Sequence, residues 1–489
     1  MATVEIAQEQ QLLIGGRWTG ASGGGTYEKA NPYTGDTATT ASAAGRDDAK
    51  AAVEAAHEAF QEWGRSAPAM RRQILSKAAD LLEERAPEIA GIVTEETGGT
   101  FGWGMFNCQL AAGILREAAA QAYGLVGEVI PSDVPGKLAM GVRAPAGVVV
   151  AIAPWNAPVI LSTRSVATPL AYANTVVLKA SEECPRTHAA VVKAIVDAGI
   201  PDGVINLITN DPGDAAGVVD ELIAHPSTRR INFTGSTKVG RIIAEKAGAN
   251  LKRVLLELGG KAPIVLLPNA DVDRAVAAAN FGAFFHQGQI CMSTERAIVD
   301  KSLADAFTSK LAEKAGALKV GDPTEQDTAL GPMINQAALE RVDGLVQDAA
   351  SKGAEIVTGG QADGPCYPPT IVKGVTPDMR LYTEEVFGPV ISIMPVDGAD
   401  EAVRVANDTE YGLSAAVFSE NVPEALEIAQ RIESGICHVN DTTVHDEPQM
   451  PFGGVKASGF GRFGGRAALE EFTELRWITV QDTERHYPI

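Results

Sequence analysis

The stretch GVVVAIAPWNAP, residues 147–158, decides the fold of this chain. Its first seven residues are an uninterrupted apolar run rich in valine, which is typical of a strand buried on both faces. Similar runs follow, separated by helical sequence such as 185–198: 175–180, 204–209, 229–235 and 254–258. Buried strands that alternate with helices predict a doubly wound α/β domain around a parallel sheet. Ligands bind such sheets at the carboxyl ends of the strands.

The regions on either side of this sheet have their own patterns. Upstream the sequence is helical: we expect Asp47 to cap a helix that runs through Trp63, and Pro68 to open a second helix. Downstream, a second α/β segment extends from about 260 to about 456. Residues 472–481 (FTELRWITVQ) read as a strand without a partner nearby in sequence. We expect that strand to pair with another region or another subunit.

Length and composition exclude several classes of protein. With 489 residues the chain has room for two or three domains, and its net charge of −21 argues against a nucleic-acid partner. No apolar run approaches the roughly 18 residues of a membrane helix, and the N-terminus lacks the features of a secretion signal. We therefore expect a cytoplasmic protein. Five cysteines at irregular spacing predict no disulfide framework, and seven dispersed histidines without a CxxC pair predict no metal site.

One of those cysteines stands in a chemically suggestive setting. Cys291 lies in FFHQGQICMSTE (284–295), among polar residues that follow a predicted helix. Glu257 interrupts an apolar strand, which makes it a candidate general base with a raised pKa, although a structural salt bridge is an equally good interpretation. Asn156 follows the first buried strand in a turn stiffened by two prolines. Its amide could stabilise an oxyanion, or it could simply form the turn.

A dinucleotide site is the second hypothesis from the residues. FTGSTKVG (233–240) follows a predicted strand and opens a helix, so its backbone N–H groups could face a phosphate; a plain βα turn is the alternative. Lys179 and Glu182 end another strand and could bind a ribose, or form a surface ion pair. GFGRFG (459–464) has the glycine spacing of a nucleotide fingerprint but follows no strand, and GGK (259–261) lacks the rest of a phosphate-binding loop, so both are rejected.

A thiol, a base, an oxyanion donor and a nicotinamide site together favour one chemistry. An aldehyde must become a tetrahedral adduct before it can give up a hydride, and a thiolate makes that adduct. The motifs PWN (154–156), FTGSTKVG, LELGGK (256–261), FFHQGQICMSTER and EEVFGPV (384–390), in this order along the chain, resemble the aldehyde dehydrogenase superfamily. The resemblance covers essentially the whole chain.

The resemblance implies an architecture. It predicts a Rossmann-type NAD-binding domain (1–126 and 146–258), an α/β catalytic domain (259–456) and a small β oligomerisation element (127–145 and 472–489). Family members of this kind are homodimers or homotetramers.

The resemblance also implies roles for individual residues. Cys291 is similar to the nucleophile, Glu257 to the base that activates the deacylating water, and Asn156, with the backbone N–H of Cys291, to the oxyanion hole. The residues similar to those that bind NAD are Lys179, Glu182, Ile152, Pro154, Trp155, Gly235, Ser236, Val239, Leu258, Glu385 and Phe387. Glu182 favours NAD because a carboxylate repels the 2′-phosphate of NADP. The turn TNDPGD (209–214) lacks the GxG of many relatives, which removes one expected cofactor contact.

Further stretches, among them WGMFN (103–107) and 438–454, resemble bacterial aromatic aldehyde dehydrogenases of the salicylaldehyde, vanillin and benzaldehyde type. Arg164 could hydrogen-bond a ring substituent, or pair with a surface acid. The apolar walls for a flat ring are expected from Trp103, Ile160, Leu161, Ile290, Met292, Val444 and Phe452.

The resulting prediction is an NAD-dependent, hydrolytic oxidation of an aromatic aldehyde in aromatic compound catabolism. Two alternatives stay open: a CoA-acylating enzyme, whose relatives typically lack the glutamate at position 257, and a catalytically inert binding or structural member of the fold.

Overall fold

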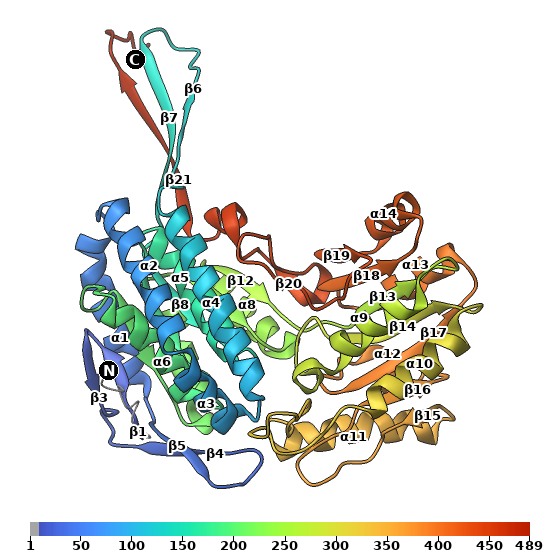
Figure 1. Cartoon of the computed structure of the whole chain (residues 1–489). Coiled ribbons are helices and arrows are strands. Elements are labelled where there is room, and N and C mark those ends of the chain that lie inside the picture. Colours follow the sequence, from blue (N-terminus) through green and yellow to red (C-terminus); the bar gives the residue numbers. More distant parts are fainter. Residues whose placement is uncertain (1–8) are drawn as a thin grey trace.

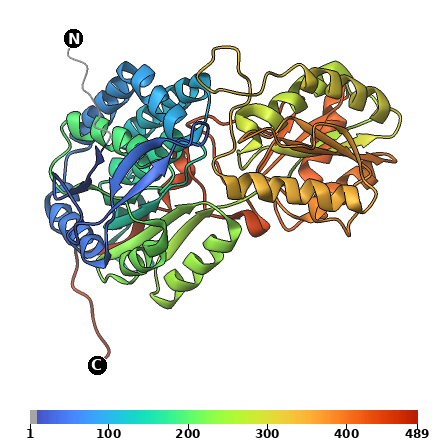
Figure 2. The same cartoon turned by 90° about the horizontal axis from the view of Figure 1, so that it is seen from below.

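Two large β-sheets, each with helices on both faces, organise the molecule (Figures 1 and 2). The computed structural model describes residues 9–489. The first sheet has eight strands in the spatial order β20 (Gly459–Phe460), β12 (Arg253–Glu257), β11 (Thr228–Thr234), β8 (Val148–Ile152), β9 (Thr175–Lys179), β10 (Ile205–Ile208), β2 (Leu12–Ile14) and β3 (Arg17–Thr19). Its five central strands are mutually parallel and match the five predicted runs, so the predicted doubly wound sheet is confirmed.

Both faces of this sheet are apolar because both are covered. Along β8, Val149 and Ala151 point into one core, whereas Val148, Val150 and Ile152 point into the other. The first core is closed by α2 (Pro68–Glu84), α3 (Ala86–Thr97), α4 (Phe101–Gln121), α5 (Pro158–Ala171) and α6 (Pro185–Asp197). The second core is closed by α1 (Arg46–Trp63), α7 (Ala215–Ala224) and α8 (Thr237–Ala249).

The N-terminal region differs from the prediction in two ways. Asp47 does not cap α1: the helix begins after Gly45, and the Asp48 carboxylate accepts hydrogen bonds from the backbone N–H groups of Gly45 and Ser22, both at 3.0 Å. Asp48 takes this role instead of Asp47, because the side chain three residues after the N-cap residue can accept a hydrogen bond from the backbone N–H of that residue. The region also contains short strands that we did not predict, including a separate sheet of β1 (Glu9–Gln10), β5 (Thr37–Ser42) and β4 (Thr26–Ala30).

The second large sheet has seven strands, in the spatial order β15 (Glu355–Thr358), β16 (Thr370–Lys373), β17 (Val390–Val396), β14 (Thr294–Asp300), β13 (Ala262–Leu266), β18 (Ser414–Phe418) and β19 (Ile436–Val439). All neighbours are parallel except β15 and β16. One face packs on α9 (Val272–Phe284) and α10 (Ala304–Gly316). The other packs on α11 (Gln336–Ser351), α12 (Arg380–Thr383), α13 (Ala399–Asn407) and α14 (Val422–Arg431).

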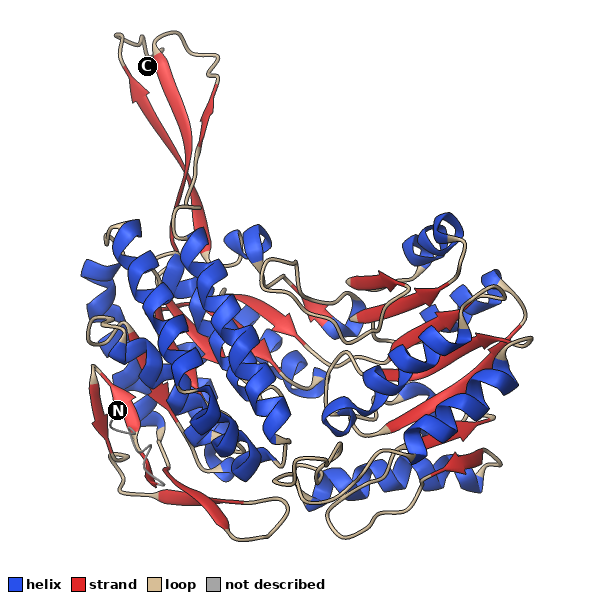
Figure 3. Cartoon of the chain, viewed as in Figure 1, coloured by secondary structure: helices blue, strands red, loops and turns tan. Residues whose placement is uncertain are grey.

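A three-stranded antiparallel arm projects from the rest of the molecule (Figure 3). It consists of β6 (Glu128–Ile130), β7 (Lys137–Pro145) and β21 (Thr473–Gln481). The strand predicted at 472–481 is confirmed, and its partner is β7, from Lys137 opposite Gln481 to Pro145 opposite Thr473. Large apolar side chains of the arm are exposed, Trp477 to 78%.

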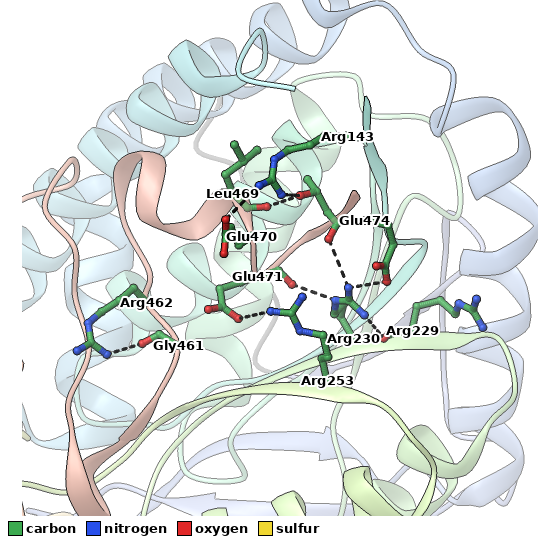
Figure 4. A network of polar contacts seen from close by, with 11 residues as sticks. Arg143, Arg229, Arg230, Arg253, Gly461, Arg462, Leu469, Glu470, Glu471 and Glu474 are labelled. Carbon is green, nitrogen blue, oxygen red and sulfur yellow. Dashed lines mark hydrogen bonds and ion pairs between the residues drawn. The ribbon is translucent and has the colours of Figure 1, made fainter. Parts of the chain in front are cut away.

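Arginines of three different segments hold the base of this arm (Figure 4). Arg230 of β11 donates to the carbonyl oxygen of Glu471 at 3.2 Å and to the Glu474 carboxylate at 2.5 Å. Arg143 of β7 donates to Thr473 Oγ1 at 3.0 Å and to Glu470 at 3.1 Å. The start of β21 is therefore tied to the large sheet as well as to β7. No helix among residues 9–489 is long and apolar enough to span a membrane.

Candidate active site

Cys291 lies where two cavities meet. The larger, of about 320 Å³, is bounded by segments that belong to both large sheets. Its wall is formed by Pro154, Trp155, Asn156, Leu161, Thr234, Gly235, Ser236, Glu257, Leu258, Gly259, Cys291, Ala338, Arg341, Glu385 and Phe387. Strands β8, β11 and β12 end at this wall, which is the carboxyl edge of the parallel sheet.

The smaller cavity, of about 60 Å³, lies on the other side of the thiol. All eight residues predicted to contact substrate line it: Trp103, Ile160, Leu161, Arg164, Ile290, Met292, Val444 and Phe452. The two cavities share Asn156, Leu161 and Cys291. A ligand on either side can therefore reach the same sulfur atom.

The loop that carries Cys291 is held in an uncommon conformation. His286 and Gln287 have φ angles of 50° and 55°, in the left-handed region that most residues avoid. The side-chain amide of Asn156 donates a hydrogen bond to the carbonyl oxygen of Gln289 at 3.0 Å. Trp103 Nε1 in turn donates to the carbonyl oxygen of Asn156 at 3.2 Å. Asn156 thus does more than shape its turn, since its amide is fixed beside the thiol.

Glu257, the last residue of β12, is only 1% exposed and has no ion-pair partner within residues 9–489, and the neighbouring Cys291 thiol acts on its carboxylate as a hydrogen-bond partner. The salt-bridge interpretation is therefore wrong. Burial raises the pKa of Glu257 to about 8, although Arg164 works against that shift. A carboxyl group with such a pKa can take up and release protons near neutral pH.

The segment rejected as a phosphate site covers Glu257. Gly459 of β20 pairs with Glu257 in register, and a Cβ atom at Gly459 would lie 2.1 Å from the carbonyl oxygen of Leu256. Only glycine permits this approach, which explains at least one glycine of GFGRFG without any nucleotide.

The Cys291 thiol is partly exposed to the cavities. Burial raises its pKa well above the ordinary value, and the charges of Glu257 and Glu385 raise it further, while Arg164 lowers it.

A buried ion pair supports the far wall of the larger cavity. Lys261 Nζ lies 2.6 Å from Glu295 Oε2, and this carboxylate also accepts from the backbone N–H groups of Val386 and Phe387 at 2.8 to 3.1 Å. Glu385, beside them, accepts from the N–H of Gly260 at 2.9 Å. Burial and the charge on Glu295 raise the pKa of Glu385 to about 7.

Sequence reasoning missed this pair. Lys261 was considered only as part of a failed phosphate loop, and Glu295 only as the end of the cysteine motif. A lysine directly before a buried strand, β13, was the available signal.

Lys179 and Glu182 do not line the 320 Å³ cavity; they lie at the carboxyl end of the neighbouring strand β9, where Lys179 pairs in register with Ile152. The two side chains form an ion pair, and Asn210 Nδ2 donates to Glu182 Oε1 at 2.9 Å. Burial acts to raise the pKa of Glu182, but Lys179 and Asn210 bring it below the ordinary value. The TNDPGD turn, which lacks the GxG of relatives, therefore contacts the predicted ribose site through Asn210.

Val239 and Ile152 are the other predicted cofactor residues outside the cavity wall. Val239 is 42% exposed in the first turn of α8, and its N–H donates to Ser236 Oγ at 3.4 Å. Ile152 is buried within β8.

The predicted substrate residue Arg164 has a partner. It forms an ion pair with Asp446, and its guanidinium lies over the Phe452 ring, 4.3 Å from the centroid. The paired acid is buried in the cavity wall, not on the surface as the alternative interpretation required. The cavity residues that sequence reasoning missed are Phe106, Leu110, Ala157, Phe281, Phe285, His445 and Asp446.

The larger cavity has features that fit NAD. The turn after β11 leaves its backbone bare, because a Cβ at Gly235 would lie 2.5 Å from the Phe233 ring, and Ser236 caps the N-terminus of α8. Such a turn can accept a pyrophosphate. Beyond it the cavity runs past Glu257 to Cys291 and Glu385. A still larger hollow of about 720 Å³, beside α1, contains none of the predicted site residues.

The chain belongs to the aldehyde dehydrogenase family, whose model matches residues 18–478. It is 55% identical, over 98% of its length and 99% of the relative's, to a vanillin dehydrogenase of Pseudomonas sp. strain HR199. To a benzaldehyde dehydrogenase [NAD(+)] of Pseudomonas putida it is 40% identical, over 98% and 99% of the two chains. The crystal structure of a salicylaldehyde dehydrogenase from Pseudomonas putida G7, complexed with salicylaldehyde, superposes with a TM-score of 0.97. That protein is 44% identical, and the match covers 98% of this chain and all of the other.

Proposed function

We propose that this protein oxidises an aromatic aldehyde to the carboxylic acid with NAD, as a step in aromatic compound catabolism. The observation that carries the proposal is the position of Cys291 between two different cavities, one with a bare strand-to-helix turn and one with aromatic walls. The names of the relatives at 40–55% identity, all of which refer to aromatic aldehydes, support it.

The first step follows from the geometry around the thiol. Cys291 Sγ, once deprotonated, attacks the aldehyde carbon and forms a thiohemiacetal, and the carbonyl oxygen becomes an oxyanion. The fixed side-chain amide of Asn156 and the backbone N–H of Cys291 stabilise this oxyanion. NAD held beside Glu385 and Phe387 would supply the hydride acceptor, and loss of the hydride from the former carbonyl carbon leaves a thioester on Cys291.

Glu257 completes the reaction. With a pKa of about 8, its carboxylate can take a proton from water as that water attacks the thioester carbon. The carbon–sulfur bond then breaks, the acid leaves, and the thiolate of Cys291 is restored.

The cofactor residues divide into two groups. Lys179 and Glu182, joined by Asn210, would hold the adenosine ribose, and the negative charge of Glu182 would disfavour the 2′-phosphate of NADP. Gly235 and Ser236 would meet the pyrophosphate, while Glu385 and Phe387, supported by the pair Lys261–Glu295, would hold the nicotinamide riboside. The remaining expected contacts are Ile152, Pro154, Trp155, Val239 and Leu258.

The domain roles follow the sheets. We assign NAD binding to 1–126 and 146–258, catalysis to 259–456, and self-association into a dimer or tetramer to the arm, 127–145 and 472–489. The exposed apolar side chains of the arm, such as Leu475 and Trp477, support the last assignment.

The burial of Glu257 weighs against both alternatives. A CoA-acylating enzyme needs no water-activating base, whereas Glu257 is kept buried and unpaired beside the thiol. In an inert binding protein, the free energy lost by burying this carboxyl group without an ion-pair partner would not be offset by any catalytic role.

Replacement of the nucleophile tests the proposal. The Cys291→Ala variant should bind NAD, measured by calorimetry, but produce no NADH from benzaldehyde or a ring-substituted benzaldehyde. Cys437→Ala, at a partly exposed cysteine outside both cavities, is the matched control and should keep activity. Dehydrogenase activity in Cys291→Ala would remove the mechanism, and acyl-CoA formation by the wild-type enzyme would remove the hydrolytic assignment.

A further inference from the structure

A buried ion pair forms part of the wall of the smaller cavity. The side chains of Arg164 and Asp446 are only 7% and 10% exposed, and both residues line the cavity that reaches Cys291. Arg164 is fixed from a second side, because its guanidinium stacks on Phe452. The pair is therefore a rigid polar element in an otherwise mostly apolar wall.

Asp446 has hydrogen-bonding capacity left over. Its Oδ2 accepts from Arg164 Nη2, but its Oδ1 is buried and has no hydrogen-bond partner in the part of the chain that the structure describes. A buried carboxylate oxygen without a donor costs free energy. A ligand that brings an O–H group to this oxygen would remove the penalty.

The remaining walls favour a flat ring. Trp103 packs edge-on against Phe285 with centroids 5.0 Å apart, and Phe285 stacks on Phe281 at 4.7 Å. The one polar atom of Trp103, Nε1, already donates to the backbone of Asn156. His445, the other titratable residue of this wall apart from Cys291 and the ion pair, has Nε2 3.2 Å from Glu447. A polar ring substituent thus has Arg164 and Asp446 as its main partners.

We infer that Asp446 is a specificity-determining residue that selects aromatic aldehydes with a ring hydroxyl group. The hydroxyl donates its hydrogen to Asp446 Oδ1, and its oxygen can accept from Arg164. This inference rests on the proposed function and narrows its substrate class from aromatic aldehydes to phenolic ones.

The chemistry of the pair separates three kinds of ring. A phenol both donates and accepts, so it satisfies the carboxylate and the guanidinium together. A methyl ether can only accept, and it leaves Oδ1 unpaired. Unsubstituted benzaldehyde does neither. An ionised phenolate would be repelled by the negative charge of Asp446, so the neutral phenol is the form selected.

Paired substrates provide the test. The ratio of kcat/KM for each hydroxybenzaldehyde (2-, 3- and 4-) to that for the methoxybenzaldehyde substituted at the same position should exceed one in the wild-type enzyme at one or more positions. In Asp446→Asn this ratio should fall about tenfold, the low end of what a hydrogen bond to a charged group contributes. Asp441→Asn, at a residue of the same loop that does not line the cavity, is the matched control and should keep the wild-type ratio.

A second variant covers the case in which Asp446→Asn fails to fold. Replacing the pair together, Arg164→Met with Asp446→Leu, removes both charges, and an apolar pair of similar volume is often tolerated. Its hydroxy-to-methoxy ratio should fall at least as far as that of Asp446→Asn.

The outcomes that overturn the inference are distinct from failure of the proposed function. An unchanged ratio in the variants, while the wild-type enzyme oxidises the aldehydes with NAD, removes the role of Asp446 alone. A ratio that rises in Asp446→Asn shows that a phenolate binds to Arg164, which also overturns the inference. If the wild-type enzyme oxidises none of these aldehydes with NAD, the proposed function itself has failed.

Discussion

Glu257 and Cys291 line the same cavity, and the carboxylate opposes ionisation of the thiol. Burial is the larger cause of the raised pKa of Cys291, and the negative charge of Glu257 adds to it. Arg164 acts in the opposite direction on both groups. The nucleophile and the base are thus coupled, and a change in one alters the protonation of the other.

The first prediction concerns the pH dependence of this coupling. Because burial raises the pKa of the Cys291 thiol well above its ordinary value, alkylation of Cys291 by iodoacetamide in the ligand-free enzyme should be slow at pH 7 and should accelerate as the pH rises. Glu257→Gln removes a negative charge, so the thiol pKa should fall and the acceleration should move to lower pH. Mass spectrometry of the Cys291 peptide measures the rate. A shift to higher pH in Glu257→Gln would contradict the coupling.

The second prediction separates the two half-reactions. Glu257→Gln should still form NADH in a rapid burst of about one equivalent per site, because acylation does not need the base. Steady-state turnover should then fall by roughly 10²–10⁴, the usual contribution of a general base. Stopped-flow absorbance of NADH resolves both phases. Loss of the burst together with turnover would mean that Glu257 acts before the thioester forms.

The third prediction concerns the choice of cofactor. Glu182→Gln removes the charge that would repel a 2′-phosphate, so kcat/KM for NADP relative to NAD should rise, by about tenfold if the lost repulsion is about 1.4 kcal/mol. Glu183→Gln, at the adjacent carboxylate that pairs with Lys29 at 2.9 Å, is the matched control. Equal ratios in the wild-type enzyme and Glu182→Gln would exclude this role.

The fourth prediction tests the support behind the nicotinamide side. Lys261→Met leaves Glu295 buried without its partner, which should lower the free energy of unfolding by about 3–5 kcal/mol and raise the KM for NAD. Lys301→Met breaks the exposed pair with Asp397 and should change the free energy of unfolding far less, because solvent screens that pair. Denaturant unfolding and NAD titration give the two readouts. Equal losses of stability in the two variants would show that the buried pair contributes no more to stability than the exposed pair does.

The central strands could be predicted because a strand that is buried on both faces is a continuous apolar run, which can be recognised from neighbouring residues alone. The run 147–153 is apolar at every position, and a helix follows each of the first four predicted runs. The strands near the N-terminus contain no such run. β2, for example, is three residues long and pairs with β10, almost two hundred residues away in sequence.

Some residues of the candidate site could likewise be predicted from the sequence, and others could not. Asn156 and Glu257 stand at the carboxyl ends of two strands of one parallel sheet, so their convergence follows from that sheet. Cys291 precedes β14 of the second sheet, and the packing of the two sheets brings it to them. Asp446 comes from a loop with no regular pattern, and only tertiary packing brings it to Arg164. Isolated ion pairs between distant residues have no signal in a single sequence.

The edge of the sheet at Glu257 has a consequence for synthesis of the chain. Ser458 Oγ, next to β20, donates to the carbonyl oxygen of Gly259 at 2.6 Å across 199 residues. At roughly 5–20 residues per second on the ribosome, this partner emerges roughly 10–40 s after β12. Throughout that interval β12 has an unpaired, mostly apolar edge, the kind of surface that invites aggregation or a chaperone. This edge of β12 is therefore completed only after nearly the whole of the second sheet has been synthesised.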